Sequence, residues 1–244
     1  MAAEHSPLSQ FEVKPWLPIE IGGVDASFTN ASFFMALVVA TITLFIVGGM
    51  RRAAAVPGRW QSMVEMAYEF VASMLTDMVG KEARKYFPFV FTLFMFILVA
   101  NLMGMIPGAF TVTSHIIVTF AFAALVFIGV TVIGFINHGL RFLKLFVPSG
   151  VPIGLALVLI PIELLSYMVR PVSLSVRLFA NMMAGHTMLK VIAGFVVLLG
   201  GWGIFPLLGI VALTGLEVLI AVLQAYVFAL LTCIYLNDAF HIEH

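Results

Sequence analysis

The sequence predicts an all-α membrane protein: an N-terminal transmembrane helix, an interfacial amphipathic helix, a transmembrane helical hairpin, and two long, steeply tilted helices that form a hairpin inside the membrane. Composition predicts this class, because 62% of the 244 residues are hydrophobic and 10% are charged, against roughly 25% charged in a soluble domain. Apolar runs of about 20 residues, the length that crosses a bilayer, recur along the chain. The formal net charge is zero, so charge does not indicate nucleic acid as a partner.

The N-terminal tail, residues 1–28, is acidic and precedes the first apolar run. Its charged residues are Glu4, Glu12, Glu20, Asp25 and Lys14. A secretory signal peptide instead begins with basic residues followed at once by a short apolar core. We therefore expect the run at 31–50 to remain in the protein as its first transmembrane helix.

Two further runs, 86–107 and 114–137, are long and apolar enough to be spans, and a short turn joins them into a hairpin. The first of them is interrupted only by Asn101. Before this hairpin, residues 57–80 place apolar side chains at helical spacing, and Pro57 suits the first turn of a helix. The pattern favours an amphipathic helix on the membrane surface over a helix that packs on a soluble partner domain.

Lysine and arginine set the predicted orientation. The 51–85 loop carries six of the twelve, the 138–148 loop adds two, and the 108–113 turn has none. Cytoplasmic loops are the ones enriched in these residues. We therefore expect the N-terminal tail and the 200–203 turn on the outer side, and the C-terminus in the cytoplasm.

The C-terminal part of the chain contains a hydrophobic stretch at 149–170 and two longer runs at 171–199 and 204–236. As helices the two longer runs would measure roughly 43 and 50 Å, against a hydrocarbon core of about 30 Å. Such helices must tilt strongly or break, and Pro171 and Pro206 permit a break. The polar residues inside them favour tilt, which keeps polar groups at mid-depth over a long lateral distance.

Polar residues inside the bilayer are costly and therefore informative. In this region they are Glu163, Arg170, Ser173, Arg177, Asn181, His186, Lys190, Glu217 and Gln224. Ser173 and Asn181 lie four residues either side of Arg177, on one helix face. His186 points to roughly the opposite side.

In a hairpin that turns at Gly200 and Gly201, residues that lie equally many positions before and after the turn reach the same depth in the membrane. Arg177 and Gln224 satisfy this condition, and His186 and Glu217 miss it by two residues. We therefore expect two polar clusters roughly 10–14 Å apart along the hairpin, with the His186–Glu217 cluster nearer the outer turn.

The residue types predict different chemistry for the two clusters. Arginine stays charged in proteins, so Arg177 is a fixed cation and a poor proton relay. A histidine that faces a carboxylate exchanges protons near neutral pH. No acid in the chain obviously neutralises Arg177, so we expect a carboxylate from another subunit to neutralise its charge.

Other polar residues keep structural interpretations. Asn101 and His115 flank the outer turn between the second and third spans, where a helix-end or packing role is at least as expected as a place in a proton path. Lys190 is interpreted as snorkelling towards the outer surface. For Arg170, a role as an anchor on the cytoplasmic side is an alternative.

The motifs "PVSLSVRLFANMMAGH" and "LTGLEVLIAVLQAYVFALLTCIYLNDA", with "NLMGMIP", "TSH" and the N-terminal "SPLSQFEV", resemble the a subunit of F-type ATP synthase over nearly the whole chain. That subunit is the stationary proton-channel subunit of the membrane sector. Histidine at 186 with glutamate at 217 is similar to alphaproteobacterial and mitochondrial members. Other bacterial members place Glu first and His second.

The resemblance implies a rotary mechanism. Arg177 would face a rotating ring of c subunits, each with a buried carboxylate. Protons would enter from the outer side past His186, Glu217 and Asn101 and neutralise a ring carboxylate. After almost a full turn, the carboxylate would release its proton into a cytoplasmic half-channel bordered by Glu163.

The resemblance also implies that Gln224 and Asn181 hold the Arg177 side chain, with Ser173 beside them. It implies a non-catalytic subunit without cofactor, built as one membrane domain over 1–244 with its proton path in 149–236. Its partners would be the c-subunit ring, peripheral-stalk b-type subunits, H⁺ and the bilayer. Its place would be the bacterial inner membrane, with the mitochondrial inner membrane as the second choice.

Two other classes of membrane protein carry polar residues at mid-depth. A secondary transporter with a midplane Arg/His/Glu site suits the charges, but no inverted repeat is visible and a transporter would carry its own counter-charge for Arg177. An intramembrane metalloenzyme would need a clustered ligand set such as HExxH, which the sequence lacks.

Overall fold

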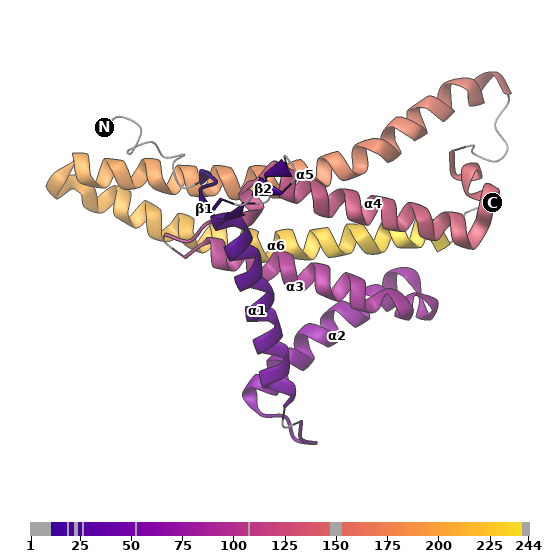
Figure 1. The fold of residues 1–244 in the computed structure, drawn as a ribbon. Coiled ribbons are helices and arrows are strands. Elements are labelled where there is room, and N and C mark those ends of the chain that lie inside the picture. The colour runs from indigo at the N-terminus through magenta and orange to yellow at the C-terminus, as the bar shows by residue number, and fades with distance from the viewer. Residues whose placement is uncertain are drawn as a thin grey trace.

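A computed structural model describes residues 11–18, 20–21, 24–25, 27–51, 53–106, 108–146 and 153–240. It is almost entirely helical (Figure 1). The α-helices are α1 (Asn30–Met50), α2 (Arg59–Val79), α3 (Phe87–Gly104), α4 (Ile116–His138), α5 (Ile153–Leu198) and α6 (Ile204–Phe240). The 3₁₀ segments are η2 (Lys81–Tyr86), η3 (Val112–Ser114), η4 (Gly139–Phe146) and η5 (Gly200–Gly203).

Five helical segments of the described chain are long and apolar enough to cross a membrane: Asn30–Met50, Lys81–Gly104, Ile116–His138, Leu157–Leu198 and Gly200–Phe240. The predicted all-α membrane class is therefore confirmed. The predicted helices at 31–50, 86–107 and 114–137 correspond to α1, α3 and α4 with ends displaced by a few residues.

The N-terminal tail contains short strands that the sequence did not predict. β1 (Pro15–Leu17) pairs antiparallel with β4 (Phe28–Thr29), and β2 (Glu20–Ile21) pairs antiparallel with β3 (Val24–Asp25). Asn30 at the start of α1 ties this segment down, because its side chain donates to the Glu12 carbonyl at 3.0 Å and accepts from the Lys14 amide at 3.1 Å.

α2 is amphipathic as predicted, and it packs on α1, α3 and α6. Val71 and Leu75 are buried against these helices, whereas Met66 is 68% exposed. Gly80 ends the helix at a φ of +98°, in the left-handed region that glycine tolerates best. The helix thus shares one face with the rest of the chain and leaves another apolar face open.

The expectation of separate segments at 149–170 and 171–199 is wrong. α5 is one helix of 46 residues that passes through Pro161 and Pro171. Proline is tolerated inside membrane helices because neighbouring groups satisfy the backbone that it frees. Beside Pro171, the Ser173 hydroxyl donates to the Arg170 carbonyl at 3.0 Å.

α5 and α6 form an antiparallel hairpin that runs across α1 (Figure 1). At helical rise they measure roughly 69 and 55 Å, so both must tilt strongly to fit within a bilayer. The turn lies at η5, as predicted. It depends on glycine, because Gly200 has a φ of +54° and a Cβ on Gly203 would lie 2.5 Å from the Val196 carbonyl oxygen.

The core joins this hairpin to α3 and α4. Leu178 and Met182 of α5 and Phe228 of α6 are fully buried in it. Small residues at Ala221 and Ala225 on α6 allow α3 to approach closely. The hairpin is therefore supported on one side by the other helices.

Candidate functional site

The two predicted clusters can be located in the register of the hairpin. His186 Nδ1 lies 2.5 Å from Glu217 Oε1, as the distances from the turn predicted. Asn181 Nδ2 donates to Gln224 Oε1 at 3.0 Å. Because η5 spans Gly200–Gly203, the hairpin is centred about one residue later than expected. His186 and Glu217 are equally distant from this centre, whereas Asn181 and Gln224 miss that condition by two residues.

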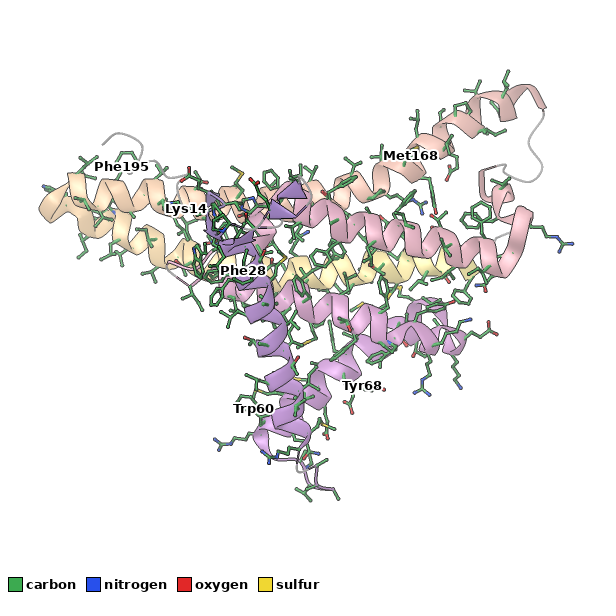
Figure 2. All side chains as sticks on the ribbon, in the orientation of Figure 1. Lys14, Phe28, Trp60, Tyr68, Met168 and Phe195 are labelled. Carbon is green, nitrogen blue, oxygen red and sulfur yellow. The ribbon has the colours of Figure 1, made fainter. Side chains whose placement is uncertain are left out.

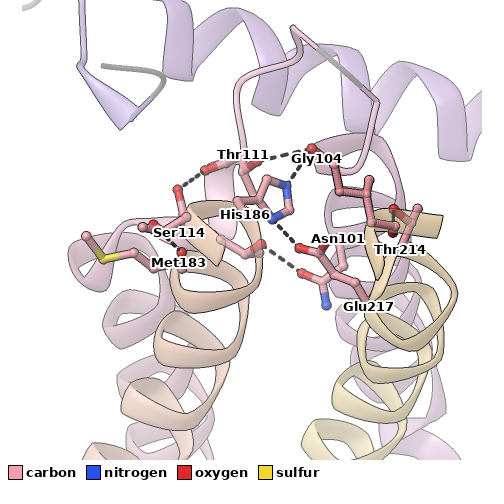
Figure 3. A network of polar contacts seen from close by, with 11 residues as sticks. Asn101, Gly104, Thr111, Ser114, Met183, His186, Thr214 and Glu217 are labelled. Carbon is pink, nitrogen blue, oxygen red and sulfur yellow. Dashed lines mark hydrogen bonds and ion pairs between the residues drawn. The ribbon is translucent and has the colours of Figure 1, made fainter. Parts of the chain in front are cut away.

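His186 is held at both ring nitrogens. Its Nε2 lies 2.8 Å from the Gly104 carbonyl oxygen, which also accepts from Thr111 Oγ1 at 3.2 Å. Figure 3 shows the ring between Gly104 and Glu217. Both His186 and Glu217 are buried, 9% and 5% exposed, so their contact is shielded from bulk water.

This geometry places a proton between His186 and Glu217. A carbonyl oxygen only accepts, so His186 Nε2 must carry a hydrogen. In the neutral ring Nδ1 then has a bare lone pair, which would face a carboxylate oxygen at 2.5 Å. Such a contact is attractive only when either the imidazole or the carboxyl group holds a proton. The pair therefore stores one proton, which His186 Nδ1 and Glu217 Oε1 can share.

Gly185 makes room for this pair, and no pattern in the sequence distinguishes it from other glycines. A Cβ at Gly185 would lie 2.6 Å from Glu217 Oε1 and 3.0 Å from its Cδ. The Glu217 carboxyl group is therefore packed directly against the α5 backbone. Only glycine allows this approach without displacing the carboxyl group.

Asn101 connects three elements beside the pair. It is fully buried; its Nδ2 donates to the Ala221 carbonyl on α6 at 3.2 Å, and its Oδ1 accepts from Thr113 Oγ1 of η3 at 2.8 Å. Ala221 is one helical turn beyond Glu217. Asn101 therefore fixes α6 where it presents Glu217, which gives it a packing role whatever else it does.

His115 does not join the pair. It precedes α4, stacks on Phe110 with ring centroids 4.9 Å apart, and has a pKa lowered by burial. Its structural interpretation is thus supported.

The two arginines of α5 differ in their partners. Arg170 Nη1 lies 2.7 Å from Asp238 Oδ2 near the end of α6, and its guanidinium lies 5.5 and 5.2 Å from the Tyr167 and Tyr235 ring centroids. Arg177 is exposed and forms no ion pair or hydrogen bond with any residue that the structure describes. Asn181 and Gln224 bond to each other, and their role in holding Arg177 stays a prediction.

The surface around Arg177 is open and apolar. Ser173 and Asn181 are exposed on the same stripe of α5, and the surrounding large apolar side chains are exposed on both helices: Val172, Val176, Leu219, Val222 and Leu223. A cleft of about 210 Å³ opens between α5 and α6, lined by Asn181, Gly185 and Glu217 among others. Of the His186–Glu217 pair, Glu217 thus lines this cleft.

A second cavity, of about 280 Å³, lies on the side of the N-terminal strands. Its lining includes Glu12, Lys14, Phe110 and Lys190, so Lys190 lines a polar cavity. The Phe11 ring lies 6.5 Å from the His186 ring. The N-terminal segment therefore comes close to the pair.

Glu163 lies fourteen residues before Arg177 on α5, is half-buried, and forms no ion pair within the described ranges. The described residues contain no group of three His, Cys, Asp or Glu side chains that could hold a metal ion.

Comparison with known proteins gives a consistent result. Residues 32–237 match the family model described as ATP synthase A chain. The chain is 59% identical to ATP synthase subunit a of Parvibaculum lavamentivorans, over 98% of this chain and 94% of that one. It is 57% identical to the subunit a of Paramagnetospirillum magneticum and 54% identical to that of Rhodospirillum rubrum, over 98% of this chain and 99% and 100% of theirs.

Proposed function

We propose that Arg177, His186 and Glu217 carry proton translocation in this chain, which belongs to the ATP synthase A chain family. The chain is thus an a subunit of F-type ATP synthase, and the secondary-transporter alternative is not supported. The observation that carries the residue assignment is the contrast between a buried one-proton pair and an exposed, unpaired arginine on one hairpin.

The first step is proton delivery. A proton enters from the outer side, by way of the cavity beside the N-terminal strands, and reaches the His186 ring. It passes between His186 Nδ1 and Glu217 Oε1, which lie close enough to share it. Glu217 lines the cleft between α5 and α6, so it hands the proton to a ring carboxylate that enters from the Arg177 side.

The second step uses the fixed charge of Arg177. A cation at the bilayer centre costs about 2.5–3.5 kcal/mol on insertion scales, and an approaching carboxylate relieves this cost. The carboxylate is held ionised beside Arg177 and becomes neutral only after it moves into reach of Glu217. Arg177 therefore separates the loading position from the unloading position and prevents a direct proton leak.

The third step is release on the cytoplasmic side, past Glu163. Arg170 is already paired with Asp238 at 2.7 Å, so it does not compete with Arg177 for the moving carboxylate. Ser173, Asn181 and Gln224 complete the polar stripe along which the carboxylate passes. Asn181 and Gln224 bond to each other, and we expect them to hold the Arg177 side chain as the carboxylate passes.

The assembly follows from this mechanism. The chain is non-catalytic and contacts a c-subunit ring through the open α5–α6 face, with b-type peripheral-stalk subunits held elsewhere on its helices. It lies in the bacterial inner membrane with the N-terminus outside and the C-terminus inside, and H⁺ is the transported ion.

Cysteine cross-linking tests the ring contact. A cysteine at Val176 or Val222, both on the exposed face, is expected to cross-link to a cysteine on the outer helix of a small c-type subunit in native membranes. Val132→Cys, exposed on α4, is the matched control and is expected not to do so. The native Cys233 is fully buried and does not interfere. Equal cross-linking from the α4 position would overturn the assignment of this face.

A further inference from the structure

The corner where α1 meets α2 has the features of a built binding site. Trp60 Nε1 donates to the Phe45 carbonyl of α1 at 3.0 Å, and the two rings lie 5.8 Å apart. A Cβ on Gly49 would lie 2.6 Å from Val64 and 2.7 Å from Trp60. Figure 2 shows Trp60 at this corner, at the bottom of the view. The two helices therefore meet in a fixed, closely packed elbow.

Gln61 holds the connecting residues in place. It is 7% exposed. Its amide nitrogen donates to the Ala54 carbonyl, its amide oxygen accepts from the Ala54 amide, both at 3.1 Å, and its nitrogen also donates to Glu65 at 2.7 Å. Gln61 thus binds both the amide and the carbonyl of Ala54, which keeps the connecting loop in a defined shape. The side chains that flank this loop therefore have defined positions.

This elbow forms an open cavity of about 510 Å³ with a positive lining. The size falls within the range of about 300–1,000 Å³ that is usual for ligand pockets. Arg51 and Arg59 both line it; among the described residues, none of those that line it is acidic, and none forms an ion pair with either arginine. Guanidinium groups favour phosphate because they donate two parallel hydrogen bonds to it.

The position of the cavity selects a lipid phosphate over a dissolved one. The apolar helix α1 ends at Met50, so Arg51 lies where the hydrocarbon region gives way to headgroups. Trp60 is 53% exposed, which suits the interfacial aromatic belt. Val47 and Met50 next to the cavity are also exposed and apolar, and offer a surface for acyl chains.

We propose that the α1–α2 elbow binds the phosphate of an anionic phospholipid between Arg51 and Arg59, with Gln61 as a positioning residue. This site is separate from the hairpin and does not depend on the proton path. A juxtamembrane Arg adds about 1 kcal/mol to binding of an anionic lipid, so loss of both should weaken it about thirtyfold.

The test uses the whole detergent-purified complex, stripped of lipid and reloaded with phosphatidylglycerol or phosphatidylcholine. Retained lipid per complex is counted by native mass spectrometry. Arg51→Gln with Arg59→Gln is expected to lose one phosphatidylglycerol that the wild type keeps. Lys81→Gln with Arg84→Gln removes two exposed charges that do not line the cavity, and is expected to keep it.

Gln61→Ala keeps both charges but frees the loop, and is expected to weaken retention as well. Unchanged retention in the double arginine variant, as when a stalk subunit covers the elbow, overturns the proposal. An equal loss in the Lys81/Arg84 variant also overturns it. Displacement of the lipid by inorganic phosphate makes this a free-anion site and overturns the lipid assignment. Equal retention of phosphatidylcholine overturns the role of net charge.

Discussion

Gly185→Ala is the sharpest perturbation of the proposed proton store, because it adds one methyl group at a known place. The new Cβ would lie 2.6 Å from Glu217 Oε1, which is 0.8 Å short of the 3.4 Å where ordinary contact begins. Glu217 must withdraw, or α5 and α6 must separate, by about that amount. The contact of 2.5 Å with His186 Nδ1 would open to roughly 3.3 Å, too long to share one proton readily.

Displacements near 1 Å in a reacting geometry cost up to about 10²-fold in rate. We therefore expect proton flux through the membrane sector to fall by between about tenfold and a hundredfold. The assay is passive proton flux in inverted vesicles stripped of the catalytic sector, normalised to the assembled complex on immunoblots.

Gly194→Ala is the matched control. It lies on the same helix and its Cβ would meet nothing within 4 Å. Both substitutions gain about 0.5–1 kcal/mol of helix preference, so a difference between them isolates the contact with Glu217. Flux through the Gly185→Ala complex equal to that through Gly194→Ala would refute the reasoning.

Two further outcomes follow from the same geometry. His186→Glu combined with Glu217→His keeps one acid and one imidazole in contact, and is expected to pass more protons in the vesicle flux assay than either single variant; a double variant no better than the singles would mean that the two residues do not act as a pair. Arg170→Gln removes a partly exposed ion pair, whose loss should cost at most about 1 kcal/mol, so ATP-driven pumping should persist. Reversal of the pair, in Arg170→Asp with Asp238→Arg, should restore the thermal stability of the complex. Abolished pumping in Arg170→Gln would show that the paired arginine also serves the ring.

Much of the fold could be predicted because the bilayer imposes length and composition on each helix. The spans α1, α3 and α4 and the turn at η5 were all visible in the sequence. The continuity of α5 through Pro171 was not, because proline alone does not tell whether neighbouring groups satisfy the freed backbone. The short N-terminal strands were also missed, since pairs of two or three residues leave no periodic pattern.

The site was predicted in part for a related reason. Distance from the turn was enough to pair His186 with Glu217, but Gln224 contacts Asn181, which lies one helical turn from the Arg177 predicted at its depth. Asp238 was overlooked as the partner of Arg170 because it lies beyond the predicted end of the last helix. Gly185 could not be recognised, because its importance is a contact across two helices.

Arg177 is exposed and forms no ion pair within the described part of the chain, and we propose that it serves a carboxylate that moves past it. ATP-driven proton pumping by the Arg177→Ala complex in inverted vesicles tests this most directly, with Arg141→Ala, exposed on η4, as the control for loss of a cation. We predict that the Arg177→Ala complex assembles to the wild-type level and pumps no protons, while the control pumps normally. Normal pumping by an assembled Arg177→Ala complex would contradict the account.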